Sequence, residues 1–140
     1  MNISELKNNL SIIILCGGKG LRLRPITKDL PKPLIRINNK TILENIVQYF
    51  LKYNIDNFIV PTGYKSKLIK NFIQKKFKNK NIKVIYTGAN SDILLRLNKS
   101  LKYSKKYFIV CYGDTLVNID LNKYLNFFLK KKNKIVMASY

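Results

Sequence analysis

The chain alternates short apolar runs with longer amphipathic segments. Each short run predicts a strand that is buried on both faces of a sheet. These predicted strands cover residues 11–16, 58–61, 83–86, 108–112 and 135–139. The segments between them carry apolar residues at helical spacing. Because strands that alternate with helices are typical of parallel βαβ units, the pattern predicts an α/β fold.

Four amphipathic segments predict the helices. The first begins after Thr41, since residues 41–44 read Thr-Ile-Leu-Glu and match a capping box. The apolar stripes of the first two helices are Ile42, Ile46, Tyr49, Phe50 and Tyr53, and then Leu68, Ile69, Phe72, Ile73 and Phe77. The third helix is expected over residues 92–103 and the fourth over residues 121–132, with Asp120 as the cap of the fourth.

Composition limits the chemistry that this fold can carry. The 140 residues fit one domain, and a hydrophobic fraction of 46% excludes an intrinsically disordered chain. No histidine is present, which excludes an imidazole base and a histidine metal ligand. Two cysteines cannot form a disulfide scaffold or a four-cysteine zinc site. Cys16 and Cys111 lie at predicted strand ends, where small buried apolar residues are favoured over reactive thiols.

The net charge of +20 has two interpretations. Lysines supply 23 of the 27 basic residues and are spread over every segment, which favours a compositional bias toward Lys, Asn and Ile. A polyanionic partner such as nucleic acid is the alternative, but no recognisable helix-turn-helix, RRM or zinc motif accompanies the charge. The longest N-terminal apolar run, residues 12–16, is too short for a membrane span or a signal peptide. A cytoplasmic location without a membrane partner is therefore expected.

The segment after the first predicted strand is rich in glycine and basic residues. Residues 17–25 read Gly-Gly-Lys-Gly-Leu-Arg-Leu-Arg-Pro. Glycines let backbone amides approach an anion closely, and ligands of parallel sheets bind outside the carboxyl ends of the strands. The segment is neither a Walker A motif nor the dinucleotide fingerprint, since Leu23 stands where the third glycine of the latter belongs. It is a candidate triphosphate cradle, with a purely structural turn as the alternative.

A second candidate element lies shortly after the glycines. Residues 29–34 read Asp-Leu-Pro-Lys-Pro-Leu, and the two prolines predict an extended segment that holds Lys32 on a stiff tether. Arg22 and Lys32 would then be two fixed cations beside a glycine-rich turn, which suits stabilisation of charge on a transferring phosphoryl group. An ordinary surface loop with a solvated lysine is the alternative.

Residues 12–34 resemble the sugar-1-phosphate nucleotidyltransferases, also called nucleoside-diphosphate-sugar pyrophosphorylases. The signature of that family is a strand, then Gly-Gly-x-Gly-Thr-Arg-Leu-x-Pro, then Pro-Lys-Pro-Leu, and this chain departs from it only at Leu21, where Thr is usual. Residues 38–43, 60–64 and 112–114 resemble later family segments. The resemblance implies a Rossmann-like three-layer α/β/α fold with a mainly parallel sheet. Residues 1–140 would be its nucleotide-binding domain, an N-terminal portion without the C-terminal sugar-binding part.

The resemblance also implies a reaction. An oxygen of a sugar 1-phosphate attacks the α-phosphorus of a nucleoside triphosphate, which gives a nucleoside-diphosphate sugar for surface polysaccharide synthesis and releases pyrophosphate. Arg22 would grip the triphosphate and Lys32 would neutralise the reacting phosphates. Asp114 would hold Mg²⁺, a role that suits an acid after an apolar strand, although a turn or cap is the alternative from sequence alone. The nucleotide-binding residues would be Leu15, Cys16, Gly17, Gly18, Lys19, Gly20, Gly88 and Arg96.

The subfamily and the activity of the chain stay open. Residues 87–91 together with Arg96 resemble the corresponding region of glucose-1-phosphate cytidylyltransferases. Other segments of the chain resemble heptose-1-phosphate guanylyltransferases equally well. Residues 93–95, Ile-Leu-Leu, depart from both, because the relatives have a glycine-containing turn there. These leucines would either enter the nucleotide space or continue a helix. A truncated, inactive relative that binds nucleotide or a partner chain is therefore an alternative, and a homo-oligomer is also open.

Overall fold

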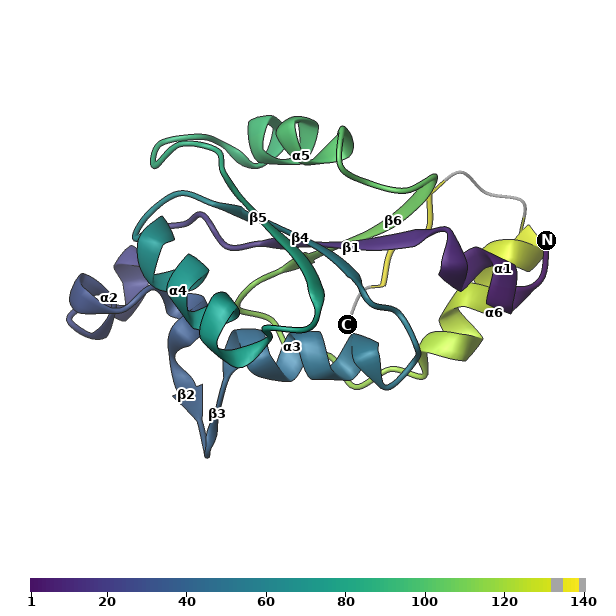
Figure 1. The fold of residues 1–140 in the computed structure, drawn as a ribbon, viewed down its shortest axis with the longest axis horizontal. Helices are drawn as coiled ribbons and strands as arrows, with labels where there is room; N and C mark the ends of the chain where they lie inside the picture. The colour runs from purple at the N-terminus through teal and green to yellow at the C-terminus, as the bar shows by residue number, and fades with distance from the viewer. Residues whose placement is uncertain (132–134, 139–140) are drawn as a thin grey trace.

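The computed structural model describes residues 1–131 and 135–138, and its centre is a four-stranded parallel sheet (Figure 1). The strand order is β5-β4-β1-β6, and every neighbouring pair is parallel. The strands are β1 (Leu10–Leu15), β4 (Asn57–Thr62), β5 (Asn81–Tyr86) and β6 (Tyr107–Tyr112). The predicted α/β fold with a parallel sheet is confirmed.

Helices cover both faces of the sheet, so the fold has three layers (Figure 1). On one face lie α3 (Ile42–Leu51) and α4 (Ser66–Lys76), and on the other lies α5 (Ile93–Leu101). Near the start of β1, α1 (Ile3–Asn8) contacts α6 (Leu121–Lys131). The remaining elements are the turns η1 (Leu21–Leu23), α2 (Ile26–Asp29) and η2 (Lys32–Leu34), and the antiparallel pair β2 (Arg36–Ile37) and β3 (Lys40–Thr41).

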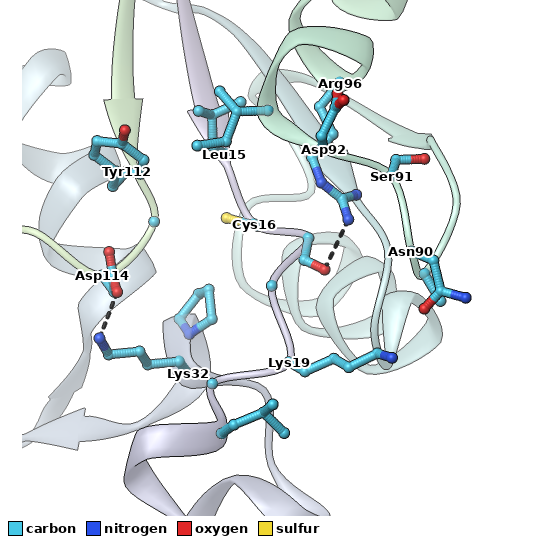
Figure 2. Close-up of a pocket in the computed structure, with 18 of the residues that line it drawn as sticks. Leu15, Cys16, Lys19, Lys32, Asn90, Ser91, Asp92, Arg96, Tyr112 and Asp114 are labelled. Carbon is cyan, nitrogen blue, oxygen red and sulfur yellow. Dashed lines mark hydrogen bonds and ion pairs between the residues drawn. The ribbon is translucent and has the colours of Figure 1, made fainter.

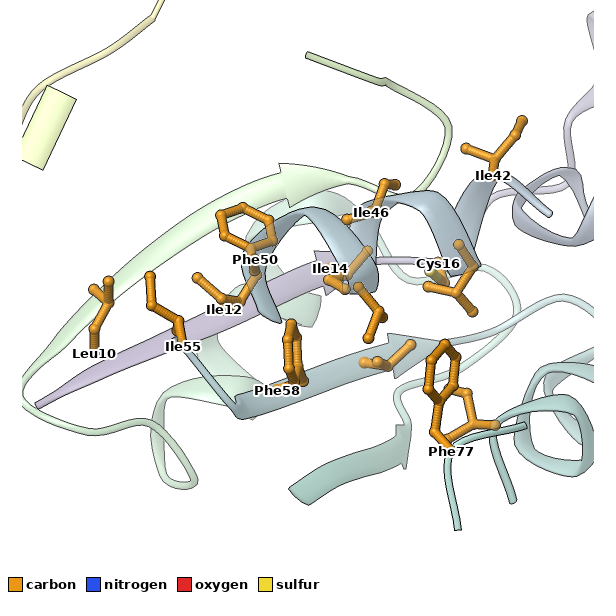
Figure 3. Packing of buried hydrophobic residues seen from close by; sticks show 14 of the residues in the cluster. Leu10, Ile12, Ile14, Cys16, Ile42, Ile46, Phe50, Ile55, Phe58 and Phe77 are labelled. Atoms are coloured by element: carbon orange, nitrogen blue, oxygen red, sulfur yellow. The ribbon is translucent and has the colours of Figure 1, made fainter. Parts of the chain in front are cut away.

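The main hydrophobic core lies between β1, β4 and α3 (Figure 3). Ile12 and Ile14 of β1 are fully buried and belong to the same cluster as Phe50 of α3 and Phe58 of β4. The Phe50 and Phe58 rings meet edge to face, with centroids 6.5 Å apart. A strand with no exposed residue forms a rigid base, and the segment that leaves β1 starts from that base.

The prediction of two-sided burial is right for β1 and β4 and wrong for β5 and β6. On β6 the residues Tyr107, Ile109 and Cys111 pack against the core, whereas Phe108, Val110 and Tyr112 are exposed. The cause is the position of α5, which lies over β4 and β1 and does not cover the edge strand β6.

The strand predicted over residues 135–139 is also wrong where the structure describes it. Residues 135–138 have no regular secondary structure, and residue 139 lies outside the described residues. The carbonyl of Val136 accepts a hydrogen bond of 2.7 Å from the Tyr124 hydroxyl of α6. The helix predicted over residues 121–132 is present from residue 121 to 131, and residue 132 is not described. Within the described ranges, none of the helices has the length and apolar character needed to cross a membrane.

The predicted capping box at the start of α3 forms only in part. The Thr41 hydroxyl accepts a hydrogen bond of 3.1 Å from the Glu44 backbone N–H. The buried Glu44 carboxylate instead lies 3.1 Å from the Lys76 ammonium at the end of α4 and accepts a bond from Gln48. The acidic residue that the sequence assigned to the cap therefore joins two helices that cover the same face of the sheet.

We expect Thr41→Ala to lower the free energy of unfolding by about 1 kcal/mol, because the first turn of α3 loses the acceptor of an N–H that is buried beside the core. Urea unfolding of the purified chain measures this change. Thr41→Ser is the matched control, since it keeps the hydroxyl, and it should stay within a few tenths of a kcal/mol of the parent. Equal stability of the Ala variant and the parent would contradict this role.

Candidate functional site

A cavity of about 730 Å³ opens at the carboxyl ends of β1 and β6 (Figure 2). The chain runs from β1 to β4 and β5 on one side, and then returns to β6 on the other side of β1. The strand order thus reverses between β1 and β6, which is where ligands bind in open α/β sheets. The cavity is lined by residues 15–23, 32–33, 89–93, 96 and 112–114.

Residues 16–20, the glycine-rich loop, leave β1 and form one wall of the cavity. The loop is anchored at both ends: the Cys16 N–H donates to the Pro61 carbonyl at 3.0 Å, and the Gly20 carbonyl accepts from the Thr27 hydroxyl at 2.8 Å. Gly20 has a φ of 63°, a conformation that favours glycine. Among the described residues, the N–H groups of residues 17–20 have no hydrogen-bond acceptor. Free backbone donors on a fixed loop are suited to an anion.

Lys32 reaches the same cavity from a turn that the sequence analysis described wrongly. The expected extended segment before the lysine is limited to Leu30 and Pro31, and Lys32 begins the 3₁₀ turn η2. The turn forms because the Leu34 N–H donates to the Pro31 carbonyl at 2.9 Å while Pro33 and Leu34 are buried. The lysine is nevertheless held on a short, fixed segment, and its side chain is about one-third exposed.

Asp114 follows β6 and forms an ion pair with Lys32, with 2.5 Å between Nζ and Oδ2 (Figure 2). The end of β6 lies tightly against β1, because the Gly113 N–H donates to the Leu15 carbonyl at 3.0 Å. A Cβ on Gly113 would lie 2.5 Å from the Cys16 sulfur, so only glycine allows this close approach. Parallel pairing therefore brings an acid and a base that are far apart in sequence to one side of the cavity.

The protein supplies only part of the ligands that a magnesium ion needs, so the nucleotide and water would have to supply the rest. No cluster of three or more His, Cys, Asp or Glu that could hold a metal ion occurs in residues 1–131 and 135–138. Asp114 offers one carboxylate, and phosphate oxygens and water would supply the other ligands, as is usual for Mg²⁺ beside nucleotides. Asp120 is not part of the site: its carboxylate accepts from the Asn122 and Lys123 N–H groups and caps α6, as predicted.

Arg96 of α5 lies behind the glycine-rich loop. The residue is only 5% exposed, and its guanidinium donates to the Gly17 carbonyl at 3.1 Å and to the Thr62 carbonyl at 3.2 Å. A third bond, of 2.7 Å, reaches the Thr87 hydroxyl. Burial lowers the pKa of Arg96 from its ordinary value. The residue lines the cavity, and three of its five N–H donors are bonded to protein oxygens.

The other predicted residues divide into those at the cavity and those away from it. Lys19 and Arg22 line it, and Arg22 forms no ion pair among the described residues. Gly88 does not line it; with a φ of 112° it shapes the turn after β5. Ile93 lines it, whereas Leu94 and Leu95 do not and have 75% and 42% of their surfaces exposed. Of the two alternatives for residues 93–95, the structure therefore has the helix, since α5 begins at Ile93.

Asp92 is a cavity residue that the sequence analysis did not single out. Its carboxylate caps α5 by accepting a 2.7 Å hydrogen bond from the Leu95 N–H. The polar run Asn90-Ser91-Asp92 before an apolar helix was the available signal.

The two cysteines match the structural interpretation. Cys16 is buried and Cys111 is half-buried, and neither forms a disulfide. Burial raises the pKa of the Cys16 thiol well above its usual value and that of Cys111 to about 12. Because a raised pKa keeps the thiol protonated at neutral pH, neither group is activated as a nucleophile.

We expect the Lys32–Asp114 pair to contribute little to stability, because both side chains are partly exposed and solvent screens their attraction. A double-mutant cycle with Lys32→Met, Asp114→Asn and the double variant, measured by urea unfolding, should give a coupling below about 1 kcal/mol. A coupling of several kcal/mol would identify the pair as a structural element of the fold.

Comparisons with known proteins agree with the resemblance of the sequence and with the fold. The family model described as nucleotidyl transferase matches residues 11–140. A D-glycero-alpha-D-manno-heptose 1-phosphate guanylyltransferase of Campylobacter jejuni is 38% identical over 114 residues, which cover 81% of this chain and 52% of the relative. A probable glucose-1-phosphate cytidylyltransferase of Bacillus subtilis is 31% identical over 134 residues, which cover 80% of this chain and 53% of the relative.

A solved structure agrees in fold. The crystal structure of HddC from Yersinia pseudotuberculosis complexed with GMP-PN has a TM-score of 0.71 and 29% sequence identity, and the match covers 85% of this chain and 54% of that chain. This chain spans about half the length of the relatives that it matches. With the family model matching nearly all of its residues, the chain belongs to the nucleotidyl transferase family.

Proposed function

We propose that this chain binds a nucleoside triphosphate in the cavity and forms the nucleotide-binding part of a sugar-1-phosphate nucleotidyltransferase. The convergence of the glycine-rich loop, Lys32 and Asp114 on one cavity carries this proposal. The size of the cavity supports it, since small-molecule sites are commonly about 300–1,000 Å³. The names of the relatives, a guanylyltransferase and a cytidylyltransferase, support GTP or CTP as the nucleotide.

The residues around the cavity have complementary tasks in this proposal. The free N–H groups of residues 17–20 would hold phosphate oxygens, and the Lys19 and Arg22 cations would neutralise the triphosphate. Asp114 would hold Mg²⁺, which supplies further neutralisation of charge on phosphate oxygens when it is bound.

The proposed transfer requires no protein nucleophile. An anionic oxygen of the sugar 1-phosphate forms a bond to the α-phosphorus, and the bond from that phosphorus to the bridging oxygen of the β-phosphate breaks. Pyrophosphate leaves with the bonding electrons, and no proton has to move. Such transfers depend on positioning and on charge stabilisation, which agrees with a site that has cations and a carboxylate but no histidine.

Lys32 has to change partner in this reaction. Its ammonium donates to one oxygen of Asp114, and that oxygen is also a ligand position for a cation. Lys32 would therefore part from Asp114 before it neutralises the attacking phosphate and the α-phosphate. The small stability contribution expected for an exposed pair means that this exchange costs little free energy.

Isothermal titration with GTP, CTP, UTP and dTTP in the presence of Mg²⁺ tests the binding proposal. We expect one of these nucleotides to bind, and Arg22→Met and Lys32→Met each to weaken its affinity about tenfold through loss of a charge-assisted contact. Lys67→Met removes an exposed lysine of α4 outside the cavity and should leave the affinity unchanged. Failure of the parent chain to bind any of the four nucleotides would refute the proposal.

Pyrophosphate release measures the transfer separately from binding. The candidate acceptors are D-glycero-alpha-D-manno-heptose 1-phosphate and glucose 1-phosphate, and the product would serve surface polysaccharide synthesis. A relative that binds the nucleotide without completing the transfer is the second candidate, favoured by the match to only about half of each relative. Release of pyrophosphate that is lost in Lys32→Met would favour the enzyme, and tight binding without release would favour the second candidate.

A further inference from the structure

Among the residues that the structure describes, Arg96 is a buried cation that forms no ion pair. Of the two charged side chains that are buried in the described part of the chain, Glu44 lies beside Lys76, whereas Arg96 forms no ion pair. The neighbouring Asp92 carboxylate caps α5 instead. Removing a charge from water is costly unless its new contacts compensate, so a buried guanidinium with only neutral acceptors indicates a function beyond filling space.

The acceptors of Arg96 come from three separate segments at the carboxyl end of the sheet. Gly17 follows β1, Thr62 ends β4, and Thr87 follows β5. The Thr87 hydroxyl also donates to the Thr62 carbonyl at 2.7 Å, which closes the network. The planar guanidinium can donate in several fixed directions at once, and a lysine ammonium cannot match that geometry.

Two glycines provide the space for this guanidinium. A Cβ on Gly17 would overlap the Arg96 guanidinium, and a Cβ on Gly63 would lie 2.7 Å from its Nη1. The first glycine of the cavity loop is therefore explained by Arg96 rather than by a ligand. Arg96 and the loop fit each other closely.

The bond to the Gly17 carbonyl fixes the orientation of one peptide group. The Gly17 carbonyl also accepts from the Tyr64 N–H at 3.2 Å, so it is held by two donors. In a trans peptide the carbonyl and the next N–H point in opposite directions. With the Gly17 carbonyl turned toward Arg96, the Gly18 N–H points away from Arg96, and this N–H has no acceptor among residues 1–131 and 135–138.

We propose that Arg96 is a positioning residue, which holds the Gly17–Gly18 peptide so that the Gly18 N–H is presented to a phosphate of the bound nucleotide. Arg96 then acts on the nucleotide through the loop, and its charge, which forms no direct ion pair in the described residues, adds to the positive potential at that loop. The part of this proposal that concerns the nucleotide rests on the proposed function above. The part in which Arg96 holds the loop rests only on the contacts within this chain.

Three variants separate the contribution of the positive charge from that of the planar guanidinium. Arg96→Met keeps a long buried side chain and removes all hydrogen-bond donors, whereas Arg96→Lys keeps the charge and removes the planar set of donors. Lys99→Met is the matched control: Lys99 lies on the same helix, its ammonium donates to the Thr87 carbonyl at 3.1 Å, and it does not line the cavity. If Arg96→Met does not fold, Arg96→Lys carries the same comparison.

Amide order parameters from NMR relaxation measure the loop without any nucleotide. In the parent chain the glycine-rich loop should be rigid, with values near about 0.85, and in Arg96→Met the values for Gly17 and Gly18 should fall toward about 0.6. Those of β1 should not change, which separates loosening of the loop from general destabilisation. The loop of Arg96→Lys should also have lowered order parameters, and the loop of Lys99→Met should have those of the parent. Unchanged order parameters in Arg96→Met would overturn the positioning role.

Titration of the same variants with the nucleotide that the parent binds tests the functional part. We expect Arg96→Met and Arg96→Lys to bind about tenfold more weakly or worse, and Lys99→Met to bind normally. Full affinity in Arg96→Met would overturn the inference. Full affinity in Arg96→Lys would show that the charge alone matters and would overturn the role of the planar guanidinium donors. If the parent binds no nucleotide, the proposed function fails, and the order parameters still decide whether Arg96 holds the loop.

Discussion

The pairing of β1 with β6 is the interaction on which the site depends. The two strands are in register along their whole length, from Leu10 opposite Tyr107 to Leu15 opposite Tyr112. Because both strands run in the same direction, their following loops start side by side, and the Gly113 N–H bond to the Leu15 carbonyl continues the pairing into those loops. A shift of one residue would move every β6 side chain to the other face and would displace Asp114 from the cavity.

Charge in the cavity is balanced between fixed and exchangeable groups. Arg96 is fixed, since burial and three acceptors hold it behind the loop. Lys32 is exchangeable, because its contact with Asp114 is partly exposed and can be traded for a phosphate. In the proposed reaction, a site that receives a triphosphate and releases pyrophosphate would need both kinds of cation. The fixed one would maintain the shape of the loop, and the movable one would follow the charge as it shifts between phosphates.

Local sequence signals predicted what local contacts determine. The apolar run of β1, the Thr41 cap and the glycines of the loop can each be recognised from residues close together in the chain. Features set by distant segments were missed or described wrongly. The exposed face of β6 depends on where α5 lies, the partner of Glu44 is on another helix, and Lys32 meets an acid 82 residues away. The family resemblance assigned Arg96 to the expected nucleotide site, but its contact with Gly17 could not be predicted, because that contact depends on α5 lying over β1 and β4.

The three glycines of the loop have different physical reasons to be glycine. At Gly17 the Arg96 guanidinium occupies the place of a side chain, and at Gly20 φ is positive and a Cβ would lie 3.0 Å from the Thr27 side chain. Gly18 has neither constraint: a Cβ there would meet nothing within 4 Å. The folded chain therefore gives no internal reason for glycine at this position. In the proposed function, a nucleotide phosphate that approaches the backbone closely enough to exclude a methyl group would supply one, and the free N–H of the same residue is suited to such an anion.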